Sequence, residues 1–248
     1  MADREYYGID APGAVGAMGI LGAVCVACAL LPNSMHGASI AHKFLPTGIG
    51  ALAGAAWMLV SSLWIKKRVM RALLGQRRWR GDEAVLDVGC GRGLLAIEAA
   101  RRVPGGKVHG VDIWQAADLS GNNPDAIRAN AAIAGVSNRL VIDTGDAREL
   151  PYPDASFDVV ASMTAIHNIA GADRRRKAIS EAWRVLRPGG QILIFDIRHA
   201  RSYLRHLCEL GAVDTVLAGP IILWGPLGWR FSATKPPGEG DSQIKLNR

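Results

Sequence analysis

Charged residues are missing from most of the first quarter of this 248-residue chain. No Asp, Glu, Lys or Arg occurs between residues 11 and 42, and after a single lysine none occurs again until Lys66. An uncharged run of about 20 residues is long enough to cross a lipid bilayer as a helix. Two such runs predict an N-terminal membrane hairpin over residues 1–65, with one span at 12–31 and a second at 46–65.

Small residues recur inside both predicted spans. Gly13, Gly16, Gly19 and Gly22 follow one another at helical spacing, and the second span contains Gly50-Ala-Leu-Ala-Gly54. Glycine and alanine allow helix backbones to approach closely in lipid. The pattern therefore predicts that the two helices pack against each other.

Two other interpretations of the first apolar run stay open. One is a cleaved signal peptide, although the leader Met1–Asp10 carries three acidic residues and one arginine, the opposite of a signal n-region. The other is a buried hairpin of a soluble core, against which the length of both uncharged runs argues.

Acidic residues are absent from residues 66–80, which contain seven lysines and arginines. The positive-inside rule places such a segment in the cytoplasm, so we predict an integral membrane protein with a basic linker at 66–81 and the rest of the chain on the cytoplasmic face. The seven charges equal the net charge of +7, so the remaining 22 basic and 22 acidic residues balance. The basic segment directly after the second span predicts a membrane surface as partner. The neutral remainder argues against nucleic acid.

Cysteine is scarce and its spacing is uninformative. Cys25 and Cys28 form a C-x-x-C within the first predicted span, and Cys90 and Cys208 stand alone. Neither a disulfide framework nor zinc-ligand spacing follows from this pattern. We predict no metal site, and small apolar packing for the C-x-x-C pair.

Strand and helix patterns alternate from Asp82 onward, which is typical of a parallel sheet covered on both faces. The expected fold class is α/β, with a doubly wound, mostly parallel, seven-stranded sheet over residues 82–235 and a flexible tail at 236–248. Strands are predicted at 84–88, 107–112, 139–143, 157–162, 191–196, 212–217 and 228–234, and helices at 93–102, 123–134, 173–186 and 200–210.

A glycine turn joins the first predicted strand to the first helix of this domain, in Val85-Leu-Asp-Val-Gly-Cys-Gly-Arg-Gly-Leu-Leu95. Glycines let the backbone bend sharply and let a ligand lie against it, and the following helix offers its N-terminal N–H groups. Asp112 ends the next strand, where a carboxylate can bind both hydroxyls of a ribose. Asp146 follows the third strand. This set predicts a nucleotide-cofactor site.

Five motifs occur in order along the domain: the glycine turn, Val108–Asp112, Gly145-Asp-Ala147, Ser156-Phe-Asp-Val-Val160 and Leu186-Arg-Pro-Gly-Gly190. This series resembles the class I S-adenosylmethionine (SAM)-dependent methyltransferases over residues 80–235. In general style the chain is most similar to small-molecule methyltransferases, such as the ubiquinone/menaquinone C-methyltransferases and the sterol-type enzymes.

The resemblance implies a role in SAM binding for twelve positions. The turn backbone would surround the methionine part, Asp87 would help to hold its amino group, Asp112 would bind the ribose, and Ser162 and Met163 would lie near the methyl group. Around the adenine, the carboxylate of Asp146 and the backbone N–H of Ala147 would bond the base. The full set is Asp87, Gly89, Cys90, Gly91, Gly93, Asp112, Ile113, Trp114, Asp146, Ala147, Ser162 and Met163.

NAD is the competing cofactor for a glycine turn after a strand. The dinucleotide fingerprint requires a glycine at position 94, where this chain has leucine. Gly93 gives G-x-G-x-G instead, which favours SAM.

The sequence contains fewer signals for the acceptor site than for the cofactor site. Methyl transfer from a sulfonium requires alignment and a dry pocket more than a catalytic side chain. His167 is a candidate base and Asn168 a candidate orienting group, because both follow the fourth strand beside the expected methyl position. The alternative, that both residues only cap the loop, stays open.

Together these features predict a membrane-anchored, cytoplasm-facing methyltransferase that acts on a small lipophilic acceptor. Two alternatives are a non-catalytic SAM-binding scaffold or sensor and, with less support, an NAD-dependent oxidoreductase.

Overall fold

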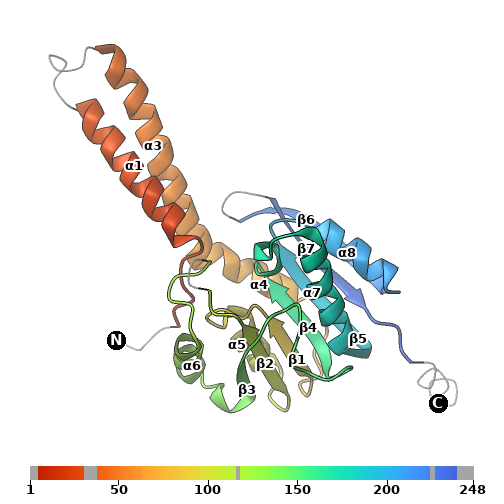
Figure 1. Ribbon diagram of the computed structural model, residues 1–248. Helices are drawn as coiled ribbons and strands as arrows, with labels where there is room; N and C mark the ends of the chain where they lie inside the picture. The colour runs from red at the N-terminus through yellow and green to blue at the C-terminus, as the bar shows by residue number, and fades with distance from the viewer. Residues whose placement is uncertain (1–4, 31–37, 116–117, 224–226, 239–248) are drawn as a thin grey trace.

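The chain is described by a computed structural model that covers residues 5–30, 38–115, 118–223 and 227–238. The first residues between the two predicted spans, 32–37, lie outside the described residues, as does the tail from residue 239. The described elements form a long helical hairpin and an α/β domain, and the hairpin projects away from the domain (Figure 1).

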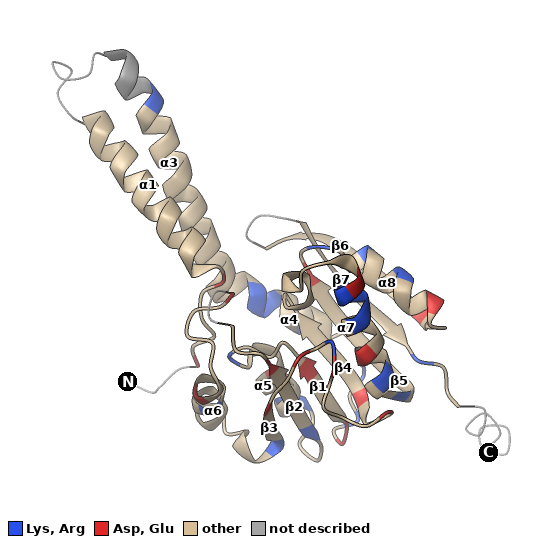
Figure 2. Cartoon of the chain, viewed as in Figure 1, with Lys and Arg blue, Asp and Glu red and all other residues tan. Residues whose placement is uncertain are grey.

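The hairpin consists of α1 (Pro12–Leu30) and α3 (Ala38–Val60), which lie side by side. Both are long and apolar enough to cross a membrane by length and composition. α3 continues through a π-helical turn, η1 (Ser61–Ile65), into α4 (Lys66–Leu74). Charged residues are concentrated in the domain and nearly absent from the hairpin (Figure 2).

Close contact between α1 and α3 depends on fewer glycines than the sequence pattern indicated. A Cβ atom at Gly22 would lie 3.0 Å from the carbonyl oxygen of Gly48, and one at Gly48 would lie 2.9 Å from that of Gly22. Gly54 faces Met18 of α1. A Cβ at Gly13, Gly16, Gly19 or Gly50 would meet open space. The prediction therefore holds for Gly22 and Gly54, is wrong for those four positions, and missed Gly48.

The basic segment that was expected to be a linker is in fact largely helix and part of the domain core. Four apolar side chains of α4, Val69, Met70, Leu73 and Leu74, are at most 5% exposed and pack in one cluster with the domain. The charges hid this pattern, because the lysines and arginines lie at the positions between the apolar ones. As a result, one nearly continuous helical path runs from the hairpin into the domain.

The sheet has seven strands in the order β3-β2-β1-β4-β5-β7-β6. The first five run parallel, and β7 pairs antiparallel with both β5 and β6. The strands are β1 (Ala84–Val88), β2 (Lys107–Asp112), β3 (Leu140–Thr144), β4 (Phe157–Met163), β5 (Leu186–Asp196), β6 (Val213–Ile222) and β7 (Leu227–Thr234).

Helices cover both faces of the sheet, because each face presents a separate apolar cluster. One cluster contains buried residues of α4, α5 (Leu94–Arg102) and α6 (Pro124–Ile133). The other contains buried residues of α7 (Ala172–Val185) and α8 (Ala200–Glu209). Short 3-10 turns, η2 (Ser137–Arg139) and η3 (Ile166–Asn168), complete the connections. The arrangement confirms the predicted Rossmann-like α/β fold.

Two strand boundaries differ from the prediction by more than one residue. β5 begins at Leu186 and not at 191, because Pro188-Gly-Gly190 forms an irregularity inside the strand and does not end it. The register shifts there, between the pairs Phe157 to Leu186 and Val159 to Gln191. β6 extends to Ile222 and does not end at 217, and residues 224–226 lie outside the described part.

Residues 5–11 form an N-terminal strap on the domain, although the sequence assigned them to the hairpin. The backbone N–H of Tyr6 donates to Asn130 Oδ1 at 3.0 Å, and Asn130 Nδ2 donates back to the Tyr6 carbonyl at 2.9 Å. The N–H of Ile9 donates to Ser120 Oγ at 2.8 Å, and Asp10 forms an antiparallel bridge with Leu119. The strap thus ties the start of α1 to the loop before α6.

Candidate functional site

A cavity of about 300 Å³ lies at the carboxyl ends of the central strands. Open α/β sheets bind ligands at this edge, where the strand order reverses beside β1 and β4. The hairpin joins the domain on the same side, since Lys66 at the start of α4 lines the cavity. Of the predicted site residues, those lining the cavity are Asp87, Gly89, Cys90, Gly91, Asp112, Ile113, Asp146, Ala147, Met163 and Asn168.

The glycine turn forms the floor of the cavity. Gly89 and Gly91 adopt left-handed backbone conformations, with φ of 74° and 52°. A Cβ at Gly89 would lie 2.2 Å from the Cβ of Ala165, and one at Gly91 would lie 2.9 Å from Leu119 Cδ2. Any side chain at either position would fill the space between the turn and the loops above it.

Gly93 has a different role from the one predicted. It is the N-cap of α5 with φ of 86°, and it does not line the cavity. A Cβ at this position would lie 2.7 Å from Ile127 Cγ1 of α6. The third glycine therefore lets α5 and α6 approach each other.

Asp112 is a carboxylate of the site that is held by three hydrogen bonds. Its Oδ2 accepts the Gly91 N–H at 2.8 Å, and its Oδ1 accepts the Trp114 N–H at 2.7 Å and Asn122 Nδ2 at 3.3 Å. A carboxylate has about four acceptor positions, so capacity remains for a ligand hydroxyl. The aspartate therefore joins the glycine turn to the end of β2 and still presents an oxygen to the cavity.

Asp87 lies beneath the turn and is 1% exposed. Its Oδ2 accepts the Ala96 N–H of α5 at 2.9 Å. Burial raises the pKa of this carboxyl to about 8; the Ala96 hydrogen bond lowers it and the nearby Asp112 raises it further. Asp87 is consequently mostly protonated at neutral pH when no ligand is bound.

Asp87→Asn is expected to change how stability depends on pH. A carboxyl whose pKa rises from 3.8 to about 8 on folding makes the native state lose stability as pH increases through that interval. The loss approaches about 1.4 kcal/mol per pH unit at most. Thermal unfolding of the detergent-solubilised chain should therefore show the variant gaining stability over the wild type between pH 5 and pH 8.

The matched control for this prediction is Asp82→Asn, because the Asp82 side chain is 69% exposed. This variant should follow the wild type at every pH. If Asp87→Asn also follows the wild type across the range, Asp87 ionises normally and the burial argument is wrong.

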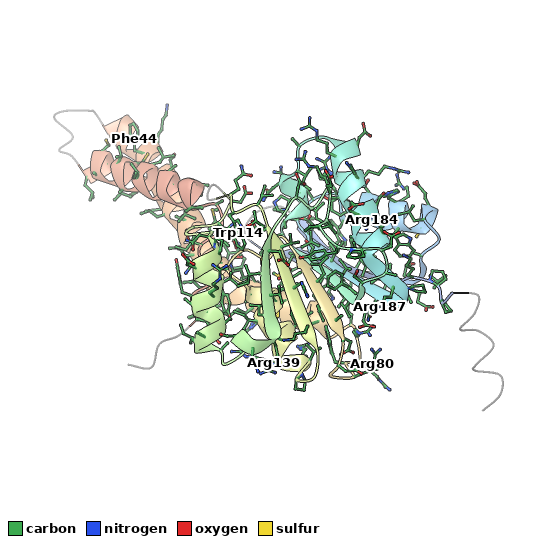
Figure 3. All side chains as sticks on the ribbon, turned by 60° about the horizontal axis from the view of Figure 1, so that its bottom comes forward. Phe44, Arg80, Trp114, Arg139, Arg184 and Arg187 are labelled. Carbon is green, nitrogen blue, oxygen red and sulfur yellow. The ribbon has the colours of Figure 1, made fainter. Side chains whose placement is uncertain are left out.

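The adenine end of the predicted site is only partly assembled as expected. Ile113, Asp146 and Ala147 line the cavity. Arg148 binds both oxygens of Asp146, with Nε at 2.9 Å from each, and this lowers the pKa of the carboxyl. Trp114 does not line the cavity, and its indole N–H donates to Thr144 Oγ1 at 2.8 Å. Figure 3 shows Trp114 at the end of the domain nearer the hairpin, far from Arg80 and Arg139.

Side chains alternate at the end of β4, so only one of two predicted neighbours reaches the cavity. Met163 lines it, whereas the Ser162 hydroxyl points away and donates to the Val88 carbonyl of β1 at 2.8 Å. Successive residues of a strand face opposite sides of the sheet. Ser162 therefore holds β4 against β1 rather than lining the site.

His167 lies just behind the cavity wall, between its lining neighbours Ile166 and Asn168. Its ring Nδ1 is 2.6 Å from Asp196 Oδ1, an ion-pair distance without hydrogen-bond alignment, and its backbone N–H donates to Asp196 Oδ2 at 3.0 Å. Asp196 ends β5 and is 1% exposed. No sequence motif indicated this aspartate, which fixes the loop that carries His167.

Three further cavity residues, Tyr7, Asp10 and Lys66, were not predicted. They come from the strap and from the first turn of α4, on either side of the hairpin. Their distance from the five motifs along the chain left no local signal. Lys66 is the first residue of the basic run, and the run as a whole predicted contact with a membrane surface and not with a cavity.

The residues present fit a nucleotide cofactor with an amino-acid end. The cradle at Gly89 and Gly91 admits a ligand where a Cβ would block it, and Asp112 offers a buried carboxylate to a ribose. The cavity volume lies at the lower end of the range for small-molecule sites, about 300 to 1,000 Å³. These features accord with the SAM site that the sequence predicts.

Part of the domain matches a known protein family. Residues 86–194 match the family described as "Methyltransferase domain". A demethylmenaquinone methyltransferase of Symbiobacterium thermophilum is 35% identical over 51% of this chain and 47% of its own length. A 27-O-demethylrifamycin SV methyltransferase of Amycolatopsis mediterranei is 37% identical over 52% of this chain and 44% of its own length. The chain thus spans about half the length of these relatives.

A solved structure agrees on the fold. The crystal structure of a SAM-dependent methyltransferase from Aquifex aeolicus superposes with a TM-score of 0.52 at 17% identity, over 66% of this chain and 88% of that one. The domain therefore has the fold of a SAM-dependent methyltransferase. The match to a methyltransferase family indicates SAM as the cofactor, in agreement with the sequence.

Proposed function

We propose that this chain, which carries a class I SAM-dependent methyltransferase domain, transfers a methyl group to a small lipophilic acceptor at the cytoplasmic face of a membrane. The observation that carries the proposal is that the glycine turn, Asp112 and the base of the hairpin all line the same cavity. When bound, SAM supplies an electrophilic methyl group on a sulfonium. The chain's residues bind the cofactor, exclude water and align the acceptor.

The cofactor-binding roles follow from the placement of each residue. Asp112 accepts a ribose hydroxyl, and the backbone of Gly89, Cys90 and Gly91 lies against the methionine part. Ile113, Asp146 and Ala147 lie at the adenine end. Arg148 binds both carboxylate oxygens of Asp146. Asp146 therefore bonds the adenine only if Arg148 releases the carboxylate or shares it with the base.

His167 serves as a base for an acceptor that must lose a proton. Asp196 holds one ring nitrogen and the backbone of the same residue, which fixes the ring beside the cavity. One relative is named for an acceptor oxygen, in 27-O-demethylrifamycin SV. An oxygen acceptor is a better nucleophile after a neighbouring group takes its proton. Asn168, on the cavity wall, orients the acceptor or the loop.

Direct tests of the activity need no known acceptor. Calorimetry with SAM and with its demethylated product, S-adenosylhomocysteine, measures cofactor binding. Incubation of the membrane fraction with methyl-labelled SAM then reveals the product. Failure of the intact chain to bind either compound contradicts the proposed methyltransferase activity. Binding without any labelled product favours a non-catalytic scaffold or sensor.

Membrane anchorage rests on the hairpin and on the basic residues that follow it. The apolar helices are exposed along much of their length, with Ile20 at 69% and Trp64 at 71%. Exposed apolar surface of this extent is typical of a membrane or partner contact. The chain should stay in the membrane pellet after alkaline carbonate extraction, and protease should reach the domain only in inside-out vesicles. Release by carbonate would contradict integral insertion.

Replacement of the apolar hairpin tests why an anchor is present. A variant in which a flexible linker of about five residues replaces residues 13–59 keeps the strap and α4. It should bind S-adenosylhomocysteine as the full chain does, yet yield at least about tenfold less labelled product from membrane-dissolved acceptors, because tethering raises their local concentration. Equal labelling by both proteins in the same membrane extract would contradict a lipophilic acceptor.

A further inference from the structure

One buried ion pair lies on the cavity wall between the strap and the hairpin base. Lys66 Nζ is 3.1 Å from Asp10 Oδ1, and the two side chains are 6% and 16% exposed. Both residues line the cavity. A buried lysine is rare unless it is paired or has a role in binding.

Neighbouring groups hold this pair in place. Ser62 Oγ donates to Asp10 Oδ2 at 3.2 Å and accepts the Asp10 backbone N–H at 3.1 Å. Lys66 Nζ also lies 3.4 Å from the carbonyl oxygen of Tyr7. The π-helical turn η1 directly precedes Lys66, and π-turns inside helices often mark functional positions. A lysine ammonium has three N–H donors, so one stays available for a ligand.

The other cations of the cavity are already engaged. Arg148 binds the carboxylate of Asp146. Arg92 donates to the carbonyl oxygens of Tyr6 and Gly121, at 2.8 and 2.9 Å, and so joins the glycine turn to the strap. Among the lining residues that the structure describes, Lys66 is therefore the cation best placed to receive a ligand carboxylate.

We propose that Lys66 and Asp10 together bind the amino-acid end of SAM, with the lysine ammonium taking the cofactor carboxylate and the aspartate carboxylate taking the cofactor ammonium. A zwitterion matches a fixed pair of opposite charges, because each of its groups meets a partner and no net charge enters the site. This inference rests on the proposed function. It moves the amino group from Asp87, where the family resemblance put it, to Asp10.

The assignment also gives the hairpin a part in cofactor binding. Asp10 precedes α1 and Lys66 follows η1, so the two residues meet only when both ends of the hairpin are docked on the domain. The segments that flank the anchor on both sides are then part of the cofactor site.

Calorimetry on the detergent-solubilised full chain tests the proposal with two ligands. S-adenosylhomocysteine carries the amino-acid end, and 5′-methylthioadenosine has the same adenine, ribose and sulfur without it. Lys66→Gln and Asp10→Asn should each weaken S-adenosylhomocysteine about ten- to a hundredfold, the usual effect of losing a hydrogen bond to a charged group. Binding of 5′-methylthioadenosine should change less than about threefold, which also shows that the variants are folded.

Arg68→Gln is the matched control, because Arg68 carries the same charge two residues further along and is exposed. It should leave both affinities unchanged, and Lys66→Arg should restore part of the loss. Equal S-adenosylhomocysteine affinity in the wild type and Lys66→Gln overturns this inference alone. Equal losses for both ligands overturn it too, since the pair would then only support the cavity. No binding of S-adenosylhomocysteine by the wild type overturns the proposed function with it.

Discussion

Asp112→Asn is expected to weaken S-adenosylhomocysteine binding by about a hundredfold or more. The substitution keeps the shape of the side chain but places an amide NH₂ where the carboxylate accepts an N–H from Gly91 or Trp114. It also removes the charge on the carboxylate that would accept a ribose hydroxyl, and a charge-assisted hydrogen bond contributes about 1.5 to 3 kcal/mol. Calorimetry on the full chain measures the change directly.

Asp125→Asn provides the comparison for this result. Asp125 lies in the first turn of α6, close to the same loop, and its side chain is 93% exposed. Asp125→Asn should not change the affinity for S-adenosylhomocysteine. Retention of wild-type affinity by Asp112→Asn, within about threefold, would show that the ribose is bound elsewhere.

His167→Ala is expected to reduce methyl transfer by about 10²- to 10⁴-fold, the usual contribution of a positioned base, and to leave S-adenosylhomocysteine binding unchanged. Asp196→Asn should show the same separation of transfer from binding with a smaller loss, because Asp196 acts by positioning His167. Labelled product formed in the membrane fraction and calorimetric affinity are the two measurements.

His199→Asn is the control for the loss of a nearby histidine. His199 adopts a left-handed backbone conformation with φ of 62°, which asparagine tolerates. Its transfer rate should stay near that of the wild type. Full transfer by His167→Ala would contradict a base and leave alignment in a dry pocket as the source of catalysis.

The glycine turn and the strands around it were predictable because their signals are local. A buried strand, a turn of glycines and the start of a helix follow one another within eleven residues, and β1 and β2 end where the sequence indicated. The errors inside these motifs concern side-chain direction. Ser162 and Met163 are adjacent, yet only Met163 faces the cavity, and a family motif does not specify which face of the strand a given residue takes.

The other errors concern contacts between residues far apart along the chain. Asp10 and Lys66 are 56 positions apart, and the hairpin between them brings them together. Asp196 reaches His167 from the end of another strand, 29 residues later. Such pairs depend on how elements pack, so no spacing rule in the sequence indicates them. The spacing of the apolar residues of α4 is a local signal of a buried helix face. The seven basic residues in the same segment favoured a membrane-surface linker instead.

The position of the strap also implies an order of events during synthesis. Tyr6 leaves the ribosome before its hydrogen-bond partner Asn130, which follows 124 residues later. Both helices of the hairpin emerge in that interval, before α6 exists to receive the strap. The cavity therefore closes only after the hairpin is made, and a chain whose hairpin fails to form would expose an unfinished site to quality-control proteases.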